Sequence, residues 1–193
     1  MSMTDTRRIL LVKHAESLLT PEVTAERWRL SDAGRAACGP LAERLRAFAP
    51  TLLVSSSEPK AMETAQLVAH ALAIPSETGL DLHEHDRSNV RLVPRGAFEQ
   101  YMAEFFAQPH DLIYGRETAD EVHTRFRGAV ERACREHPDQ RPAIVTHGTV
   151  IALLVARANK LDALSFWKRL TMPAIVVVRL PLFALDEVIT DIA

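Results

Sequence analysis

The chain has 193 residues, of which 47% are hydrophobic and 25% are charged, and its formal net charge at pH 7 is -2. These values are ordinary for a soluble globular protein and lack the basic excess that is typical of nucleic-acid-binding proteins, so we expect no nucleic-acid partner. The most apolar stretch, Pro173–Leu185, is interrupted by Arg179 and Pro181. A membrane-spanning helix needs about 20 apolar residues, so we expect no membrane association.

Two cysteines, Cys38 and Cys134, are far apart in the sequence and form no C-x-x-C pattern. This spacing favours free thiols in a reducing compartment over a disulfide or a metal-binding pair. The apolar run Ile9–Val12 is too short for a secretory signal. We therefore expect a cytoplasmic protein, and the length favours a single domain over residues 1–193.

The first half of the chain alternates short apolar runs with amphipathic segments. Arg8–Val12 and Thr51–Ser55 are predicted to be buried strands because they are short, apolar and rich in β-branched residues and leucine. Asp32–Phe48 is predicted to be a helix capped by Ser31. A second helix is predicted over Pro59–Leu72, because proline suits a first helical turn.

The middle of the chain is polar and basic before it becomes helical again. We predict a helix over Ala97–Phe106, within an excursion of about 86–114 that covers the main body. The helix predicted over Thr118–His137 has Thr118 and Glu121 spaced as a capping box, so Glu121 is interpreted as a cap and not as a catalytic group.

The last part of the chain completes the pattern. Ala143–Thr146 is predicted to be a buried strand, with a helix behind it over Val150–Ala158. Closing strands are predicted over Ile175–Leu180 and Glu187–Ile192, and their spacing through Pro181 is compatible with a hairpin. Alternation of strands and helices predicts an α/β fold: a three-layer α/β/α sandwich with a mainly parallel sheet.

Reactive side chains follow three of the predicted strands. Lys13 and His14 follow the first, Lys60 lies just after the second, and His147 and Gly148 follow the third. Because ligands bind beyond the carboxyl ends of the strands in such sheets, we expect these residues to converge on one edge.

This set of residues suits phosphoryl transfer. A neutral histidine held in one tautomer can act as a nucleophile, and attack on a phosphate needs positive charge or donors around the phosphoryl oxygens. Lysines and a helix start supply such groups. Glu84 is the candidate for the acid that protonates the leaving oxygen. The chain lacks the glycine-rich nucleotide-binding motifs, and we expect no cofactor.

Five motifs in order resemble those of the histidine phosphatase superfamily, the phosphoglycerate-mutase-like proteins. Residues 11–17, LVKHAES, resemble L-x-R-H-G-E-[ST], and residues 30–34, LSDAG, resemble L-[ST]-x-x-G. Residues 55–65, SSSEPKAMETA, are similar to S-S-x-L-x-R-A-x-x-T-A. Residues 115–121, GRETADE, and 145–148, VTHG, are similar to G-E-S-x-x-[ED] and V-[ST]-H-G. The resemblance covers most of the chain.

The resemblance implies a role for each matching residue. His14 would form a phosphohistidine, Glu84 would donate a proton and later activate water, and His147 would stabilise the transferring group. Lys13 and Lys60 occupy the positions of the two phosphate-binding arginines of the family.

Three further residues are candidates for binding the substrate phosphate. Thr20 stands where many members place an asparagine, and Ser17 and Gly148 belong to the two histidine motifs. Ser17 and Thr20 are also compatible with ordinary loop or capping roles.

The departures from the family pattern leave two interpretations open. Both arginines are lysine, and the glycine after the first histidine is Ala15. Lysine keeps the charge but cannot make the planar two-pronged contact of arginine. Either the pocket is rearranged and active, or the protein binds a phosphorylated ligand in a regulatory role with little or no catalysis.

Other acids and histidines compete for these roles. Glu16, Asp86 and Glu117 are alternative proton donors, and His83 and His85 beside Asp86 suggest a metal-dependent hydrolase. Because a full metal site needs further ligands with suitable spacing, we favour a site without metal.

We therefore predict a phosphomonoester hydrolase that acts on a small phosphorylated metabolite through a phosphohistidine. A mutase is disfavoured, because the segment 86–114 is short for a sugar-acid pocket. That segment is expected to select the substrate, and its Arg87, Arg91 and Arg95 hint at anionic substrates. A homodimer is compatible with the sequence.

Overall fold

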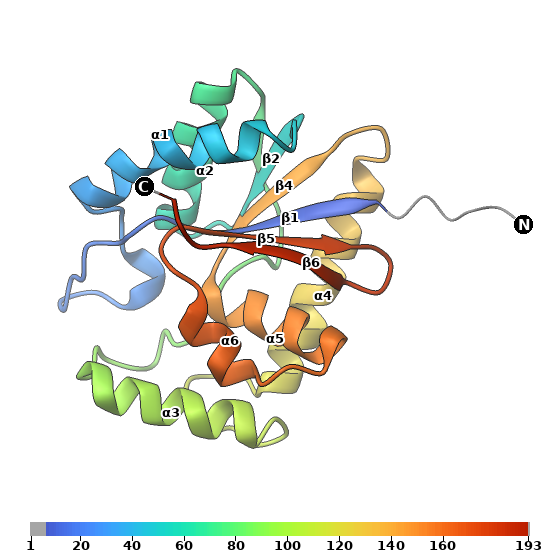
Figure 1. Cartoon of the computed structure of the whole chain (residues 1–193). Coiled ribbons are helices and arrows are strands. Elements are labelled where there is room, and N and C mark those ends of the chain that lie inside the picture. Colours follow the sequence, from blue (N-terminus) through green and yellow to red (C-terminus); the bar gives the residue numbers. More distant parts are fainter. Residues whose placement is uncertain (1–6, 193) are drawn as a thin grey trace, which may run out of the picture.

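The computed structural model describes residues 7–192, and its centre is a six-stranded sheet in the order β3-β2-β4-β1-β5-β6 (Figure 1). The strands β3, β2, β4 and β1 are parallel, and β5 and β6 are added antiparallel at one edge. The strands span β1 Arg8–Lys13, β2 Leu52–Ser55, β3 Ser76–Thr78, β4 Pro142–Thr146, β5 Ala174–Arg179 and β6 Ala184–Ile189. The prediction of a mainly parallel sheet is confirmed.

Helices cover both faces of the sheet, which confirms the three-layer prediction. α1 and α2 pack on one face, and α4 and α5 pack on the other (Figure 1). The helices span α1 Asp32–Arg46, α2 Pro59–Leu72, α3 Arg95–Ala107, α4 Ala119–Glu136, α5 Gly148–Asn159 and α6 Ala163–Arg169, with a short 3-10 helix, η1, at Ala25–Arg27.

The central strands are apolar on both faces because each face supplies a separate core. Ile9 and Leu11 of β1 pack with the α4–α5 layer, and Leu10 and Val12 pack with the α1–α2 layer. Fully burying side chains of this size contributes about 1.5–3 kcal/mol each. This explains why β1 is a continuous apolar run in the sequence and not an alternating one.

Three predicted helix starts are confirmed, whereas α3 and α5 begin two residues earlier than predicted. The Ser31 hydroxyl accepts a hydrogen bond from the Gly34 N–H at 3.0 Å. Thr118 and Glu121 form the predicted capping box at the start of α4. Pro59 is the first residue of α2.

Several elements differ from the predictions. α1 ends at Arg46, and the last strand lies at Ala184–Ile189 because it pairs with β5 as a hairpin. The strand β3 and the helix α6 were not predicted. β3 is exposed along its length, and only Phe166 of α6 is buried, so neither has a clear apolar period.

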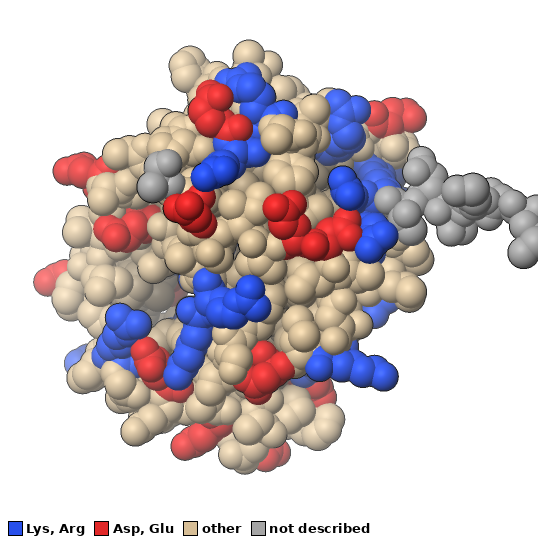
Figure 2. All heavy atoms as spheres, in the orientation of Figure 1, with Lys and Arg blue, Asp and Glu red and all other residues tan. Residues whose placement is uncertain are grey.

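The segment between β3 and α4 contains α3, which lies beside α6 at the bottom of Figure 1, away from the sheet. Phe98 of α3 contacts Trp167 of α6 with ring centroids 5.8 Å apart. Cys38 and Cys134 are buried free thiols, as predicted. Basic and acidic side chains intermingle on the face shown in Figure 2. Over residues 7–192, none of the helices is long and apolar enough to span a bilayer.

Candidate active site

Two histidines meet where the adjacent parallel strands β1 and β4 end. Lys13 lies opposite Thr146 in the strand register, so the next residues, His14 and His147, emerge at the same level. Their ring centroids are 5.1 Å apart, and the His14 N–H donates to the Thr146 carbonyl at 2.9 Å. Strand register alone therefore brings together residues that are far apart in the sequence.

The His14 ring has the state that a nucleophile needs. Its Nδ1 lies 2.7 Å from the Ala15 carbonyl oxygen, which can only accept a hydrogen bond. Nδ1 therefore carries the proton, and Nε2 keeps a free electron pair. Burial, followed by the neighbouring His147 and Lys60, holds the pKa of His14 well below its ordinary value. The imidazole is neutral at neutral pH.

His147 is fully buried and contacts the end of β2. Its Nε2 is 2.9 Å from the Ser56 hydroxyl oxygen and 3.4 Å from Oε1 of Glu58. Burial and the nearby Lys60 charge hold the pKa of His147 well below its ordinary value. His147 is therefore neutral, and the positive charge at the site has to come from other side chains.

The Glu84 carboxylate occupies the N-terminus of α5. It accepts hydrogen bonds from the N–H groups of Thr149 at 3.0 Å, Val150 at 3.3 Å and His85 at 2.9 Å. Burial on its own raises the pKa of Glu84, but Arg87, His147 and these N–H donors outweigh it and lower the pKa to about 2. The backbone N–H groups at the start of α5, which were expected to bind the phosphate of a substrate, thus already donate to Glu84.

The segment that carries Glu84 is fixed by Arg125 of α4. The Arg125 guanidinium donates to the carbonyl oxygens of Asp81, His83 and Glu84 at 2.9–3.1 Å. It also pairs with Glu117 at 2.7 Å, so Glu117 serves to hold this segment and is not free to act as an acid. One partly buried cation therefore contacts three carbonyl oxygens of the segment that carries Glu84.

Gly115 lets the chain approach the Glu84 segment closely. Its φ is +90°, and a Cβ there would lie 2.4 Å from the Asp86 carbonyl oxygen. The Arg116 N–H donates to the same carbonyl at 2.8 Å. The motif over residues 115–121 therefore supports the site and starts α4, and it is the glycine that permits the contact.

Both predicted phosphate-binding lysines are bound by neighbouring groups. Lys60 Nζ is 2.6 Å from the Ala25 carbonyl oxygen and 2.6 Å from Oε2 of Glu58. Lys13 Nζ donates to the Leu170 carbonyl at 2.7 Å. Burial lowers the pKa of Lys13 to about 8, although Glu84 partly opposes this shift. Both ammonium groups lie at the site, with some of their donors already used.

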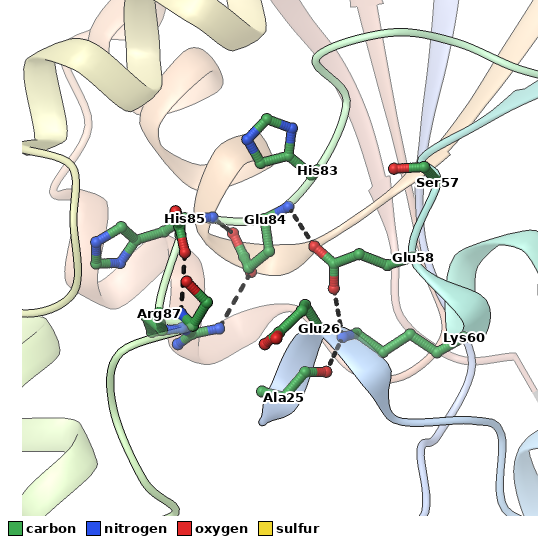
Figure 3. Close-up of a pocket in the computed structure, with 11 residues that line it drawn as sticks. Ala25, Glu26, Ser57, Glu58, Lys60, His83, Glu84, His85 and Arg87 are labelled. Carbon is green, nitrogen blue, oxygen red and sulfur yellow. Dashed lines mark hydrogen bonds and ion pairs between the residues drawn. The ribbon is translucent and has the colours of Figure 1, made fainter. Parts of the chain in front are cut away.

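A cavity of about 430 Å³ opens beside Glu84 and Lys60 (Figure 3). Most of its lining residues are polar, and they carry both signs of charge. The lining residues are Ala25, Glu26, Ser57, Glu58, Lys60, His83, Glu84, His85, Asp86, Arg87 and Ser88. His14, His147 and Lys13 are not among the lining residues, and His14 retains 6% exposure. A ligand in the cavity therefore first meets the carboxylates and cations of the wall.

Three predicted phosphate contacts are placed differently. Ser17 forms an isolated bridge with Leu30, and the Thr20 hydroxyl donates to the Leu18 carbonyl at 3.4 Å. Neither lines the cavity. Gly148 begins α5, where a Cβ would lie 3.2 Å from Cε of Lys13. The role visible for Gly148 is to leave room for that lysine.

The histidines of the metal hypothesis do not converge. The His83 and His85 rings point in different directions in Figure 3, and His85 stacks on Phe105 with centroids 4.3 Å apart. In the part of the chain that the structure describes, no group of three or more His, Cys, Asp or Glu side chains is arranged to hold a metal ion.

Sequence reasoning missed Glu58. This carboxylate is buried, and its Oε1 accepts the Glu84 N–H at 2.8 Å while its Oε2 binds Lys60. A signal was present, since Glu58 stands where the family segment has leucine. The residue at this apolar position of the motif thus forms an ion pair with Lys60.

Comparison with known proteins identifies the family. Residues 9–181 match the model of the histidine phosphatase superfamily, branch 1. The chain belongs to this superfamily. It is 30% identical over 171 residues to phosphoglycerate mutase-like protein 4 of Arabidopsis thaliana, covering 80% of this chain and 72% of that protein.

Solved structures share the fold of this superfamily member. YhfR of Bacillus stearothermophilus aligns with a TM-score of 0.74 at 22% identity, covering 93% of this chain and 94% of that chain. The mycobacterial glucosyl-3-phosphoglycerate phosphatase in complex with inorganic phosphate aligns with a TM-score of 0.74 at 20% identity, covering 94% and 96%. At these identities the likeness concerns the fold.

Proposed function

We propose that this protein is a phosphomonoester hydrolase that acts on a small phosphorylated metabolite through a phosphohistidine formed on His14. The observation that carries the proposal is the His14 ring, which is neutral, oriented through Nδ1 and placed 5.1 Å from His147. Phosphatases among the solved neighbours support the reaction class.

In the first step Nε2 of His14 forms a bond to phosphorus, and the bond from phosphorus to the substrate oxygen breaks. His147 and Lys60 stabilise the charge on the phosphoryl oxygens. The departing oxygen takes a proton from Glu84. A phosphoryl dianion next to Glu84 raises the pKa of that carboxyl, which Arg87 and the neighbouring N–H donors otherwise hold low.

In the second step water replaces the histidine on phosphorus. The Glu84 carboxylate takes a proton from the attacking water, and the bond between His14 and phosphorus breaks to release inorganic phosphate. The reaction as proposed uses no metal and no cofactor. The protein belongs to a variant subgroup in which Lys13 and Lys60 replace two arginines, and it works in the cytoplasm.

The test is hydrolysis of p-nitrophenyl phosphate by the wild type, His14→Ala and His70→Ala, each with and without a chelator. His70 is an exposed histidine on α2 and serves as the matched control. We expect hydrolysis that survives the chelator, is lost in His14→Ala and persists in His70→Ala.

Each of the other outcomes would support a different function. Turnover that stops with the chelator would point to a metal-dependent hydrolase. Saturable phosphate binding without turnover would point to a phospholigand-binding protein. Transfer of the phosphoryl group within a phosphoglycerate, without release of phosphate, would point to a mutase.

A further inference from the structure

Arg87 is a cation of the cavity wall to which the reaction above assigns no role. It follows Glu84 by three residues, and its side chain is 15% exposed. Its Nη2 lies 4.0 Å from Oε2 of Glu84, and its guanidinium carbon lies 5.0 Å from the centre of the Phe98 ring. Arg87 thus lies between the segment that carries Glu84 and α3.

The structure separates Arg87 from the other two arginines of the segment 86–114. Arg95 pairs with Glu99 on the surface and its side chain is 93% exposed, and Arg91 is also exposed. Of these three arginines, Arg87 is the one that lines the cavity. Burial and position therefore mark it as a ligand-facing residue.

Lys13 and Lys60 have few hydrogen-bond donors left for the phosphoryl group of a substrate. Lys60 already binds Ala25 and Glu58, and Lys13 already binds Leu170. A phosphoryl group presents three oxygens that need donors in the transition state, and an ammonium makes point contacts only. A guanidinium has five N–H donors in a planar fork that matches two phosphoryl oxygens.

We propose that Arg87 binds the phosphoryl group of the substrate and supplies the two-pronged contact that Lys13 and Lys60 cannot make. In Figure 3 the Arg87 guanidinium and the Lys60 ammonium face the cavity from opposite sides. At 4.0 Å the contact of Arg87 with Glu84 is longer than a hydrogen bond, so donors remain for a ligand. This inference rests on the proposed function.

The same contact links substrate binding to the proton donor. Arg87 is the strongest of the neighbouring groups that lower the pKa of Glu84. An anion on Arg87 offsets its charge, so the pKa of Glu84 rises when substrate is present. Arg87 thereby favours a protonated Glu84 at the stage when the leaving oxygen needs a proton.

The test compares Arg87→Gln, Arg87→Lys and the control Arg91→Gln. Titration calorimetry gives the dissociation constant for inorganic phosphate, and kinetics with p-nitrophenyl phosphate give kcat and KM for a substrate with one anionic group. Charge-assisted hydrogen bonds of this kind predict phosphate binding weaker by about tenfold to a hundredfold in Arg87→Gln. Arg87→Lys should recover part of the affinity, and Arg91→Gln should stay within about twofold of the wild type, as expected for an exposed arginine.

Unchanged phosphate affinity in a folded Arg87→Gln overturns the proposal, and so does a shifted pH–rate profile with unchanged affinity, because Arg87 then acts only on Glu84. If Arg87→Gln shows no cooperative thermal melt, it is not folded, and the phosphate affinity of Arg87→Lys is used instead. An affinity of Arg87→Lys equal to that of the wild type then overturns the proposal. A wild type that binds phosphate without hydrolysing the ester refutes the hydrolase but leaves the Arg87 test intact. A wild type that binds no phosphate refutes both.

Discussion

The two sides of the candidate site are held by different kinds of interaction. On the strand side, His14 and His147 emerge from paired parallel strands, and their backbone position follows from the register of β1 and β4. On the loop side, Glu84 lies on an irregular segment whose carbonyl oxygens are held by the Arg125 side chain. One side depends on the sheet, and the other on side-chain contacts from several elements, of which Arg125 makes the largest share of those to carbonyl oxygens.

This difference predicts how each side fails. The strand side is part of the core and moves only if the packing around the sheet moves. The residues around Glu84 form neither helix nor strand, so we expect their backbone to open at a lower free energy than the sheet. Removing a loop-side contact should therefore cost stability and displace Glu84, whereas a change behind the strand side should cost stability and displace His14.

The largest effect is expected from Arg125→Ala. The change leaves the mostly buried Glu117 without its partner and frees three carbonyl oxygens. We expect the free energy of unfolding to fall by about 2–4 kcal/mol and kcat/KM to fall more than tenfold. Urea unfolding and p-nitrophenyl phosphate kinetics measure both. Arg135→Ala, an exposed change on the same helix, is the control. Equal losses in the two variants would contradict the anchoring role of Arg125.

An intermediate effect is expected from Gly34→Ala on the strand side. A Cβ at Gly34 would lie 2.0 Å from the Glu16 carbonyl oxygen, so the segment after His14 must move. We expect a loss of about 1–3 kcal/mol in unfolding free energy and reduced kcat. Gly39→Ala in the same helix meets nothing within 4 Å and should instead stabilise by about 0.5–1 kcal/mol. Thermal melts of both variants provide the test, and a neutral Gly34→Ala would show that the strand side tolerates displacement.

The smallest effect concerns the charge of Lys13. Its pKa of about 8 means that the ammonium loses its proton as the pH rises through 8, so anion binding weakens there. We expect the inhibition constant for sulfate, whose charge is constant over this range, to rise by about tenfold between pH 7 and pH 9.

Lys13→Arg tests this assignment because arginine keeps its charge over that range. The variant should lose the pH dependence without gaining kcat/KM at pH 7, since the contact with the Leu170 carbonyl suits a lysine. Lys60→Arg should likewise not gain kcat/KM, because Lys60 is buried against Glu58 and Ala25. A pH dependence that persists in Lys13→Arg would assign it to another group.

The sequence by itself determined the layers of the fold and the strand side of the site. A continuous apolar run such as β1 can be recognised as a buried strand from the sequence alone. A strand that is covered on both faces needs apolar residues at every position. Caps such as Ser31 and Thr118 depend on residues three positions away, so local spacing was sufficient. The convergence of His14 and His147 follows from parallel pairing, which the alternation of elements implies.

Only the tertiary structure decided the state of the charged groups. The partners of these side chains are not fixed by any local period of the sequence. Examples are the hydrogen bonds of Arg125, the ion pair of Glu58 with Lys60, and the position of Arg87 in the cavity wall. Their charge states depend on burial and on neighbours from other elements. The sequence could therefore propose His14 as the nucleophile, but the groups that surround the phosphoryl position needed the folded chain.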